Sequence, residues 1–484
     1  MKKLNQYIDL LEKEQLIVEN KANLDFDVEH ISYSSMDVKE NTLFICKGAN
    51  FKGEYLKDAF DKGAKCYIAT KPILEDVPHI IVNDIRLALT KLSEYFYDGI
   101  WNDNLSMVGI TGTKGKSTTA VFIKAILDEY KKNKCSFLSG VYTFDGRHTD
   151  KAPTLTTPET LELHKHLNES VKNECEYLVM EVSSQALKYR RTDALQYKIG
   201  VFLNLGEDHI SDSEHPDFDD YFNSKLLIFK QCDIAVVNGD IEEEFLAKIL
   251  NEANKYCSKV ITYAEHKDAD VKGQLIKADA EQLTFNLEEC GEMLLNIGGD
   301  YNLSNALCAI AICYELGIPF EFIKSGLANV KVPGRMETYR LKDKDVVVII
   351  DKAHNKMSYE ALFKSLKETY PDRKMMFMFG CVGDKAYNRR KEGGEVADRE
   401  ADYIVLTEKE SGKEKTIDIC NEIKSHISNK DKVEIIEDRE EAIVHCLNKA
   451  ENGWVIILAG DGHVMRGNQI VKDGELVIEY NESK

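Results

Sequence analysis

The sequence has no excess of positive charge and no long apolar segment. Its 484 residues carry 63 Lys and Arg against 83 Asp and Glu, a formal net charge of −20. This balance disfavours a nucleic-acid-binding surface, because such surfaces need clustered cations. No apolar run approaches the roughly 18 residues that span a membrane, and nothing at the N-terminus resembles a signal peptide. These absences predict a soluble, cytoplasmic protein that binds neither nucleic acid nor membrane.

Cysteine pairs and internal repeats are missing as well. The 12 cysteines are scattered without a Cys-x-x-Cys pair or a regular spacing, so we expect reduced, mostly buried thiols. No low-complexity segment is present. No Gly-x-Gly-x-x-Gly occurs between a strand and a helix, which disfavours a dinucleotide site. The length suits about three domains of roughly 100–200 residues each.

The strongest positive signal is Gly112-Thr113-Lys114-Gly115-Lys116-Ser117. An apolar run over residues 105–110 predicts a buried strand before it, and the residues after it predict a helix. The two glycines let backbone N–H groups approach phosphate oxygens, and the positive end of the helix faces them. Lys116 supplies a charge and Ser117 a hydroxyl for Mg²⁺. The motif therefore predicts a phosphate-binding loop, the alternative being a chance turn rich in Gly and Lys.

Strand and helix patterns predict an α/β fold in three domains. Residues 1–98 form a small α/β domain, and residues 99–332 form a central P-loop ATPase-like domain with a parallel sheet. Residues 333–484 alternate strands and helices as a Rossmann-like, doubly wound sheet does. Trp101–Asn104 is typical of a linker, and residues 259–298 indicate an antiparallel flank.

Polar residues at strand ends in the central domain are candidate ligands. Glu181 ends a buried strand, and a carboxylate beside a phosphate-binding loop is expected to face a metal ion. Asp208 and His209 follow the next strand and would converge on the same place, although a lone histidine is more often structural. From the residues alone, Lys225 is expected to be a solvated helix lysine. Thr156, Thr157 and Asn302 are equally compatible with helix caps.

Six motifs stand in register along the chain: Gly112–Ser117, Thr156–Glu159, Met180–Ser184, Asn204–His209, Gly334–Glu337 and Phe379–Asp384. Their order and separations resemble those of the Mur ligases, and among these the branch that extends UDP-N-acetylmuramoyl-dipeptide. The resemblance covers essentially the whole chain. It implies domains for the uridine nucleotide, for ATP and for an incoming amino acid. It also implies a reaction in which ATP phosphorylates a substrate carboxylate and the amine of an amino acid attacks the acyl phosphate.

The resemblance assigns roles to the residues that match its motifs. It implies that ATP is held by Gly112, Thr113, Lys114, Gly115, Lys116, Ser117, Thr118 and Asn302, and from across the domain gap by Arg335 and Asp351, with His354 nearby. It implies a catalytic set of Lys116, Glu181, His209 and Lys225, and Mg²⁺ ligands at Ser117, Glu181, His209 and a carbamylated Lys225. It implies that substrate is bound at Ser34 by its uridine end, at Thr156, Thr157, Ser183 and Arg191 by its muramoyl-peptide, and at Arg390 by the α-carboxylate of the amino acid.

The residues that select the amino acid depart from the family pattern. The Asp-Asn-Pro-Arg of diaminopimelate-adding members is Lys409-Glu410-Ser411-Gly412 here, and Gly-Lys-Gly-His-Glu is Gly460–Val464. Since the bidentate Arg is missing, meso-diaminopimelate is not the expected substrate, and L-lysine or another amino acid is. Asp-Tyr-Ala-His is Asp351–His354, Ser-Ser-His is Ser183–Gln185, and the segment from His209 to Lys225 is slightly longer than is common.

Two other functions are compatible with the motifs. One is a Mur-like ligase acting on a different carboxylate, such as a polyglutamate or a specialised peptide. The other is a nucleotide-binding paralogue without catalysis, which the intact Lys116, Glu181, His209 and Lys225 argue against. We expect the favoured enzyme to act as a monomer on UDP-MurNAc-L-Ala-D-Glu and a free amino acid, with ATP and Mg²⁺.

Overall fold

A computed structural model describes the chain apart from residues 49–50, 152–154, 207–209, 211–213, 280, 289, 333, 385, 461–462 and 467–468. The chain divides into two compact units, residues 1–271 with 307–323, and residues 272–306 with 324–484. Both contain parallel sheets with helices, which confirms the α/β class. Within the described ranges, no helix is both long and apolar enough to cross a bilayer.

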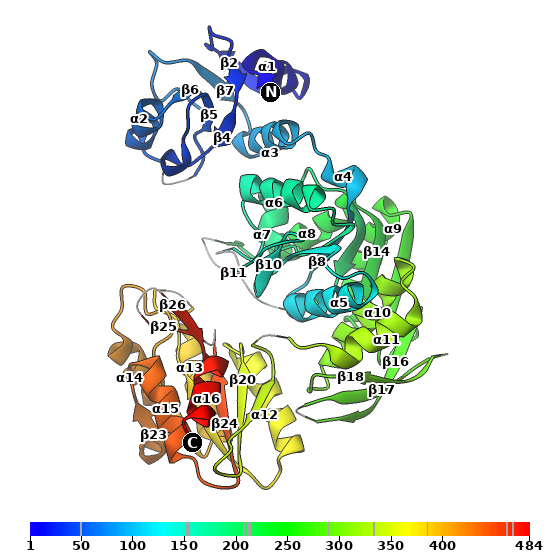
Figure 1. Ribbon diagram of the computed structural model, residues 1–484, viewed down its shortest axis with the longest axis vertical. Coiled ribbons are helices and arrows are strands. Elements are labelled where there is room, and N and C mark those ends of the chain that lie inside the picture. Colours follow the sequence, from blue (N-terminus) through cyan, green and yellow to red (C-terminus); the bar gives the residue numbers. More distant parts are fainter. Residues whose placement is uncertain are drawn as a thin grey trace. The chain divides into compact units, whose positions relative to one another are not determined.

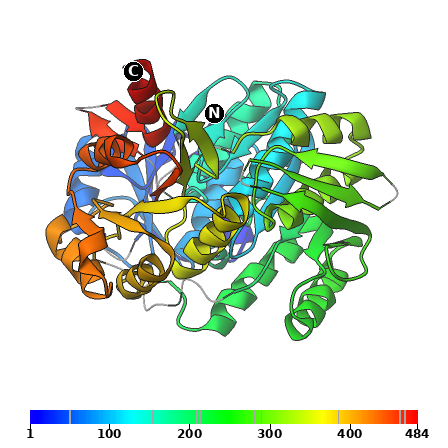
Figure 2. The same ribbon diagram turned by 90° about the horizontal axis from the view of Figure 1, so that it is seen from below.

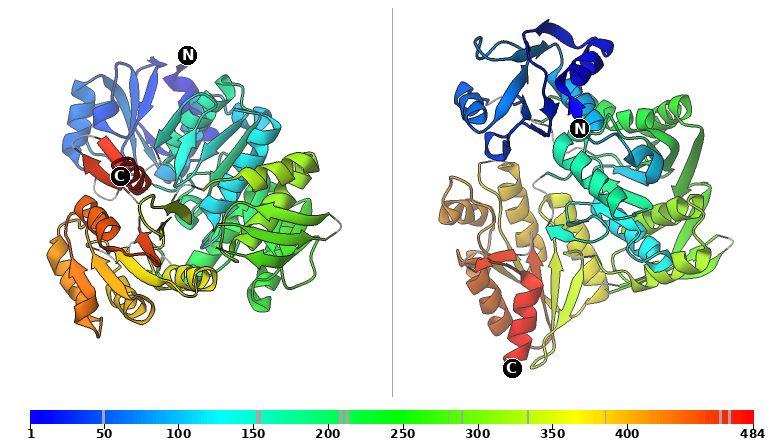
Figure 3. Two further views of the ribbon diagram at one scale, coloured as in Figure 1. Left: turned by 60° about the horizontal axis from the view of Figure 1, so that its bottom comes forward. Right: turned by 45° about the horizontal axis from the view of Figure 1, so that its top comes forward.

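The N-terminal sheet of the first unit has the order β2 (Ile17–Asn20), β7 (His79–Val82), β6 (Ala64–Ala69), β5 (Thr42–Ile45), β4 (His30–Ser32). Its strands are parallel except for β2, which is antiparallel to β7. Alternate strand residues point to opposite faces, so α1 (Leu4–Lys13) and α3 (Ile85–Phe96) cover one face and α2 (Gly53–Asp61) the other (Figure 3). The α/β character predicted for residues 1–98 is therefore confirmed.

The second sheet of this unit contains the predicted strand before the phosphate-binding loop. Its order is β11 (Thr149–Lys151), β10 (Tyr142–Phe144), β9 (Cys135–Leu138), β12 (Tyr177–Glu181), β8 (Ser106–Thr111), β13 (Tyr197–Phe202), β14 (Cys232–Asn238), β15 (Lys259–Ala264). The strands β9, β12, β8, β13, β14 and β15 are parallel, whereas β10 and β11 form an antiparallel hairpin. Since β8 lies between β12 and β13, the loops that follow these three strands meet at one edge.

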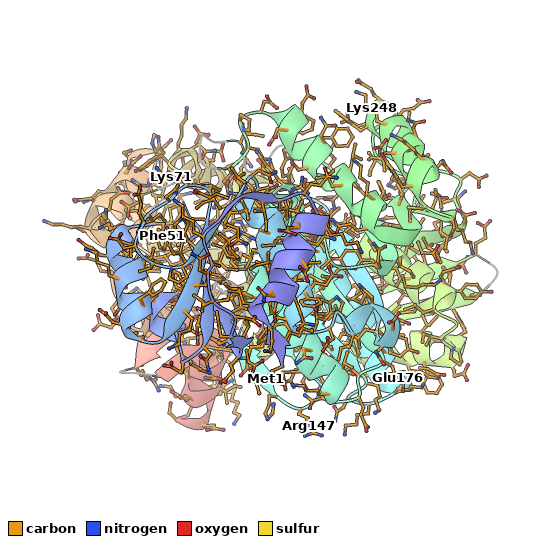
Figure 4. The ribbon with its side chains drawn as sticks, turned by 90° about the horizontal axis from the view of Figure 1, so that it is seen from above. Met1, Phe51, Lys71, Arg147, Glu176 and Lys248 are labelled. Carbon is orange, nitrogen blue, oxygen red and sulfur yellow. The ribbon has the colours of Figure 1, made fainter. Side chains whose placement is uncertain are left out.

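Helices flank this second sheet (Figure 1). They are α5 (Lys116–Tyr130), α6 (Thr160–Lys172), α7 (Ser184–Lys188), α8 (Phe218–Leu226) and α9 (Glu243–Tyr256). The amphipathic α9 shows how they pack: Ile249 and Ala253 are buried, while Lys248 points into solvent (Figure 4). Arg147, in the turn between β10 and β11, is likewise exposed (Figure 4).

Two predictions for these segments are corrected. Trp101–Asn104 is a short helix, α4, rather than a linker, because the Trp101 ring is fully buried and its Nε1 donates to Ala194 O at 3.4 Å. The antiparallel flank is confirmed for β16 (Val271–Ala278), β17 (Leu283–Leu287) and β18 (Gly291–Leu295). It is wrong for β15, which pairs in parallel with β14.

The second unit contains the predicted doubly wound sheet, in the order β19 (Glu337–Arg340), β20 (Val346–Asp351), β24 (Trp454–Ala459), β21 (Lys374–Phe379), β22 (Tyr403–Leu406), β23 (Val433–Ile435). Only the edge strand β19 is antiparallel. Helices cover both faces (Figure 2). The face with Met376 and Met378 packs against α15 (Arg439–Lys449) and α16 (Asp473–Glu482), whereas Phe377 and Phe379 contact Tyr359 of α12 (Lys356–Thr369).

The structure contains further helices, short strands and 3₁₀ turns. They are β1 (Lys2–Lys3), β3 (Asp27–Val28), α10 (Asn302–Glu315), α11 (Phe320–Asn329), α13 (Asn388–Glu400), α14 (Thr416–Ser425), β25 (His463–Arg466), β26 (Gln469–Lys472) and the 3₁₀ turns at Ser35–Asp37, Leu227–Gln231 and Lys430–Lys432.

Candidate functional site

The phosphate-binding loop connects β8 to α5, as predicted. Gly115 has a φ of +82°, a value that residues with a side chain rarely adopt. A Cβ atom at Gly112 would lie 2.8 Å from the Cβ of Leu203, so the neighbouring strand end leaves no room for one. Glycine is therefore required at both positions, and the N-terminus of α5 stands directly behind the loop.

Two lysine ammonium groups meet at one carbonyl oxygen of this loop. Lys116 Nζ donates to Gly112 O at 2.8 Å and to Thr113 O at 3.1 Å. Lys225 Nζ, from α8, donates to the same Gly112 O at 2.9 Å. Lys225 is only 2% exposed, so its interpretation as a solvated helix lysine is wrong. Two positive charges at a helix N-terminus form a site that attracts phosphate groups.

Two side chains to which the sequence analysis assigned no role hold the loop in place. Asn204 Oδ1 accepts from the backbone N–H groups of Thr113 at 3.0 Å and Lys114 at 2.8 Å, and its Nδ2 donates to Lys114 O at 3.0 Å. Tyr221 Oη lies 3.1 Å from Thr113 Oγ1, and its ring lies 4.4 Å from Lys225 Nζ. The place of Asn204, shortly after a predicted strand beside the loop, is a signal that could have found it.

Glu181 lies at the end of β12, next to β8. Its Oε1 accepts from Ser139 Oγ at 2.6 Å and from Gly140 N at 2.8 Å, and the residue is 2% exposed. Both of these hydrogen bonds reach Oε1, so among the described residues Oε2 has no hydrogen bond and can face a cation. His209 and Asp208 lie outside the described residues. In the part of the chain that is described, no three His, Cys, Asp or Glu side chains form a metal cluster.

The residues expected to bind the muramoyl-peptide come together beside Glu181. Thr157 Oγ1 donates to Glu181 O at 2.9 Å and accepts from Ser183 N at 2.9 Å. Arg191 Nη1 donates to Thr157 O at 3.4 Å. The helix-cap interpretation of Thr157 is wrong, since Glu159 is the N-cap of α6. Thr156 is half-buried beside it.

A pocket of about 210 Å³ in the first unit adjoins this group, and three cations line it. Glu159 forms ion pairs with both Lys47 and Arg191, the latter at 2.7 Å. The guanidinium of Arg86 stacks on the Tyr189 ring at 3.8 Å. Arg191 is buried, and its Nε has no hydrogen-bond partner among the described residues. An unpaired donor and a surplus of positive charge fit an anionic group of a ligand.

Lys47 and Arg86 were missed by the sequence analysis, because nothing in their local sequence distinguishes them from surface cations. Ser34 does not line the pocket. Its Oγ accepts from Met36 N at 3.3 Å at the start of a 3₁₀ turn, so it acts as a cap in this structure.

A buried histidine connects the helices that carry Ser183 and Lys225. His215 is fully buried, its Nδ1 lies 2.5 Å from Asp220 Oδ2, and its Nε2 lies 2.9 Å from Ser184 Oγ. Asp220 also accepts from Lys188 Nζ at 2.6 Å. Since Ser184 and Lys188 belong to α7 and Asp220 belongs to α8, His215 ties the two helices together.

In the second unit, the structure brings Arg335 and Asp351 together. Their nearest charged atoms, Nη1 and Oδ1, are 4.0 Å apart, and Asp351 also accepts from Met336 N at 3.0 Å and Ala353 N at 2.8 Å. Burial raises the pKa of Asp351, against the opposing effect of the Arg335 charge. Arg335 Nε is buried and finds no acceptor within the described part of the chain. His354 Nδ1 lies 2.8 Å from Lys352 O.

Asn302 and Arg390, both expected to contact small molecules, are engaged by the protein itself. Asn302 Nδ2 donates to Gly298 O at 2.7 Å, and its Oδ1 accepts from Asn305 Nδ2 at 3.1 Å. Arg390 is buried and donates to both oxygens of Glu414, at 2.9 and 2.7 Å, and to Glu422 at 2.6 Å. These hydrogen bonds raise the pKa of Arg390, so it stays protonated. Its positive charge is already balanced by the carboxylates of Glu414 and Glu422.

Comparisons with known proteins agree with the resemblance. Residues 110–313 match the Mur ligase middle domain, and residues 334–462 match the domain described as Mur ligase, glutamate ligase domain. The chain is 38% identical to the UDP-N-acetylmuramoyl-L-alanyl-D-glutamate–L-lysine ligase of Enterococcus faecalis, covering 90% of this chain and 87% of that protein. It is 34% identical to the UDP-N-acetylmuramoyl-L-alanyl-D-glutamate–2,6-diaminopimelate ligase of Clostridium perfringens, covering 96% and 95%.

A solved structure of a UDP-N-acetylmuramoyl-L-alanyl-D-glutamate–2,6-diaminopimelate ligase has the same fold. It superposes with a TM-score of 0.64 at 21% identity over 94% of each chain. Full-length similarity and both family domains therefore accompany the phosphate-binding loop described above. The chain belongs to the Mur ligase family of ATP-dependent, ADP-forming amide ligases.

Proposed function

We propose that this enzyme uses ATP to add an amino acid to UDP-N-acetylmuramoyl-L-alanyl-D-glutamate in peptidoglycan precursor synthesis. The observation that carries the proposal is the meeting of Lys116 and Lys225 at Gly112 O, with Glu181 on the adjacent strand. Relatives named for this reaction align over nearly the whole chain.

The chemistry needs that concentration of charge. A carboxylate is a poor electrophile, and its phosphorylation brings two anions together before an amine can displace phosphate. The loop N–H groups and Lys116 are suited to neutralising the transferred phosphoryl group. In the second unit, the unpaired Nε of Arg335 is suited to an anionic group of the nucleotide, and Asn302, Asp351 and His354 are further candidate nucleotide contacts.

The donor set fits Mg²⁺ when Lys225 is carbamylated. Mg²⁺ prefers oxygen ligands, and Ser117 and Glu181 Oε2 supply two. Reaction of the neutral Lys225 amine with CO₂ forms an N–C bond and releases a proton, which leaves an anionic carbamate with two further oxygens. We assign His209 to the same metal set on the basis of its motif. Bound Mg²⁺ would supply charge neutralisation of the acyl phosphate.

The first unit supplies features suited to the nucleotide-linked substrate. Thr156, Thr157, Ser183 and Arg191 form a polar group beside Glu181 that suits the muramoyl-peptide carboxylate. The cationic pocket of Lys47, Arg86 and Arg191 suits a diphosphate, and Ser34 is a candidate contact for the uridine end. We accordingly assign the uridine nucleotide to residues 1–98, ATP to residues 99–332 and the amino acid to residues 333–484.

The proposed amino acid is L-lysine rather than meso-diaminopimelate. Gly412 stands where the diaminopimelate-adding pattern has an Arg, and Arg390 is already neutralised by Glu414 and Glu422. A second free carboxylate on the amino acid would therefore lack a bidentate partner. We further propose that the enzyme works as a cytoplasmic monomer.

An assay of phosphate release tests the proposal directly. The full-length protein is supplied with ATP, Mg²⁺ and UDP-MurNAc-L-Ala-D-Glu, together with L-lysine, meso-diaminopimelate or another amino acid. We expect release with L-lysine and far less with meso-diaminopimelate. Release that requires a different carboxylate, such as a folate or a peptide, would replace this substrate, and the absence of release with every pair would refute ligase activity.

A further inference from the structure

Two cysteines far apart in the sequence lie in contact at the start of β14. Cys232 is the first residue of that strand, and Cys257 follows the last residue of α9, which packs beside it (Figure 1). Their Sγ atoms are 3.4 Å apart, and both sulfurs face the carbonyl oxygen of Phe229, at 3.9 and 3.6 Å. A sulfur–sulfur contact of this length needs only a small movement to become a covalent bond of about 2.05 Å.

Small reagents can reach this pair. Cys257 is half-buried, and Cys232 lines a cleft of about 570 Å³ together with Asp233, Tyr256 and Ser258. Cys308 and Cys313, which are near each other in the sequence, are by contrast completely buried. Exposure and contact with a second thiol therefore coincide at Cys257.

The chemistry of the pair favours Cys257 as the attacking sulfur. A hydrogen bond from Cys232 lowers the pKa of Cys257, against burial and the nearby Asp233 carboxylate, which raise it. The thiolate is the reactive form of cysteine, so attack starts where it is stabilised.

We propose that Cys232 and Cys257 form an oxidation site at which hydrogen peroxide produces an intramolecular disulfide. The Cys257 thiolate attacks the peroxide, an S–O bond forms as the O–O bond breaks, and hydroxide leaves and becomes water. Cys232 then attacks this sulfenic acid, the S–S bond forms as the S–O bond breaks, and a second water leaves. Two thiols and one peroxide thus give one disulfide and two waters.

The position of the pair predicts what the disulfide does. Cys232 lies at the amino end of the parallel strands, whereas the phosphate-binding loop follows their carboxyl ends. Closing the loop between residues 232 and 257 restricts the unfolded chain and stabilises this part of the first unit. We expect ligase turnover to remain within about 2-fold of the reduced enzyme, because the pair and the phosphate-binding loop lie at opposite ends of the strands.

Mass spectrometry of the full chain tests the site. Reduced protein is treated with sub-stoichiometric hydrogen peroxide, free thiols are alkylated and the digest is searched for linked peptides. We expect the peptide pair joining Cys232 to Cys257 to appear first, with reversal by dithiothreitol. Oxidation of the exposed Cys290 while this pair stays alkylated would overturn the proposal, as would a stable sulfinic acid at Cys257 without a cross-link.

Matched variants separate the site from general oxidation. Cys232→Ser and Cys257→Ser should each remove the cross-link, whereas Cys420→Ser, at a buried thiol of the second unit, should retain it. A cross-link to another cysteine in the wild-type protein would also contradict the assignment. The wild-type result decides the matter even where a variant fails to fold.

Discussion

Lys225 shares one carbonyl oxygen with Lys116, so two ammonium groups approach each other at a buried position. Like charges at close range repel each other, and the repulsion is stronger where little water screens it. A carbamate removes the conflict, because it converts one cation into an anion that Lys116 can attract. The carbamate proposed for Lys225 would therefore fit this position, although the sequence around a helix lysine shows no sign of it.

Replacement of Lys225 tests this reasoning. Lys225→Ala should lower kcat at least about 100-fold, by analogy with the loss of one preorganised charged group. Short carboxylates such as formate should restore part of the activity, because they supply the missing anionic oxygens. Lys116→Ala should lower kcat as much, and short carboxylates should not restore its activity. Lys248→Ala, at an exposed helix position, should have the kcat of the wild type. Unchanged kcat in Lys225→Ala would refute the carbamate.

The buried His164 predicts a loss of stability in acid. Burial lowers its pKa from 6.5 to about 3, and its Nδ1 lies 2.9 Å from Ser93 Oγ in α3. The unfolded chain binds the proton first, so unfolding is favoured as the pH falls from 6.5 towards 3, by roughly 3 kcal/mol at pH 4. His164→Gln should flatten the fall of the melting temperature over this range, whereas the exposed His266→Gln should not. Equal pH profiles for all three proteins would exclude His164 as the cause.

At the scale of elements, α7 and α8 act as one support for the site. His215 joins Ser184 of α7 to Asp220 of α8, and the two helices carry the candidate groups for substrate and metal. Because the Asp220 carboxylate can only accept, Nδ1 of His215 is the donor in this hydrogen bond, and Nε2 of the same ring contacts Ser184 Oγ. Gln185 stands where the family motif Ser-Ser-His has its histidine, and His215 places an imidazole against the neighbouring Ser184 instead.

His215→Ala should separate turnover from nucleotide binding. A misplaced catalytic group costs up to about 100-fold in rate, so kcat should fall 10- to 100-fold while KM for ATP changes little. Asp220→Asn should follow in the same direction. Steady-state kinetics and the melting temperature are measured together, with His266→Ala as the control. Full activity in a folded His215→Ala protein would show that the contact only fills space.

The helices and strands that could be predicted are those whose formation depends on residues near one another in the sequence. The strand, loop and helix around Gly112–Ser117 follow from residues adjacent in the chain, and so do the periodic apolar strands. The burial of Lys225 was not predictable, because the same helix pattern suits a solvated lysine. The pairing of Arg390 with Glu414 was missed because residues 24 apart meet only after the sheet has formed. The β10–β11 hairpin escaped for a related reason, since its short polar strands depend on pairing with β9.

At the scale of the whole molecule, a local cluster of cations must attract the anionic substrate against the repulsion from the negative net charge. A protein with a net charge of −20 repels an anionic nucleotide at long range, although salt screens this beyond about 10 Å at 0.1 M. The first unit contains a pocket that can attract such a substrate. Lys47, Arg86 and Arg191 line it together with a single carboxylate, that of Glu159. Binding energy for the nucleotide-linked substrate should therefore come mainly from the first unit.

Hydrogen exchange can localise that binding energy. A ligand at 100 times its Kd stabilises the segments it orders by about 2.7 kcal/mol, so their amide exchange slows measurably. UDP-MurNAc-L-Ala-D-Glu should slow amide exchange in residues 30–48 and 155–191, because the polar group and the cationic pocket belong to the first unit. Amide exchange in the strands β20 to β24 of the second unit should stay unchanged. Free L-lysine at the same ionic strength is the control and should not protect residues 30–48. Protection confined to residues 334–460 would contradict this division, since it would place the nucleotide-linked substrate on the doubly wound sheet.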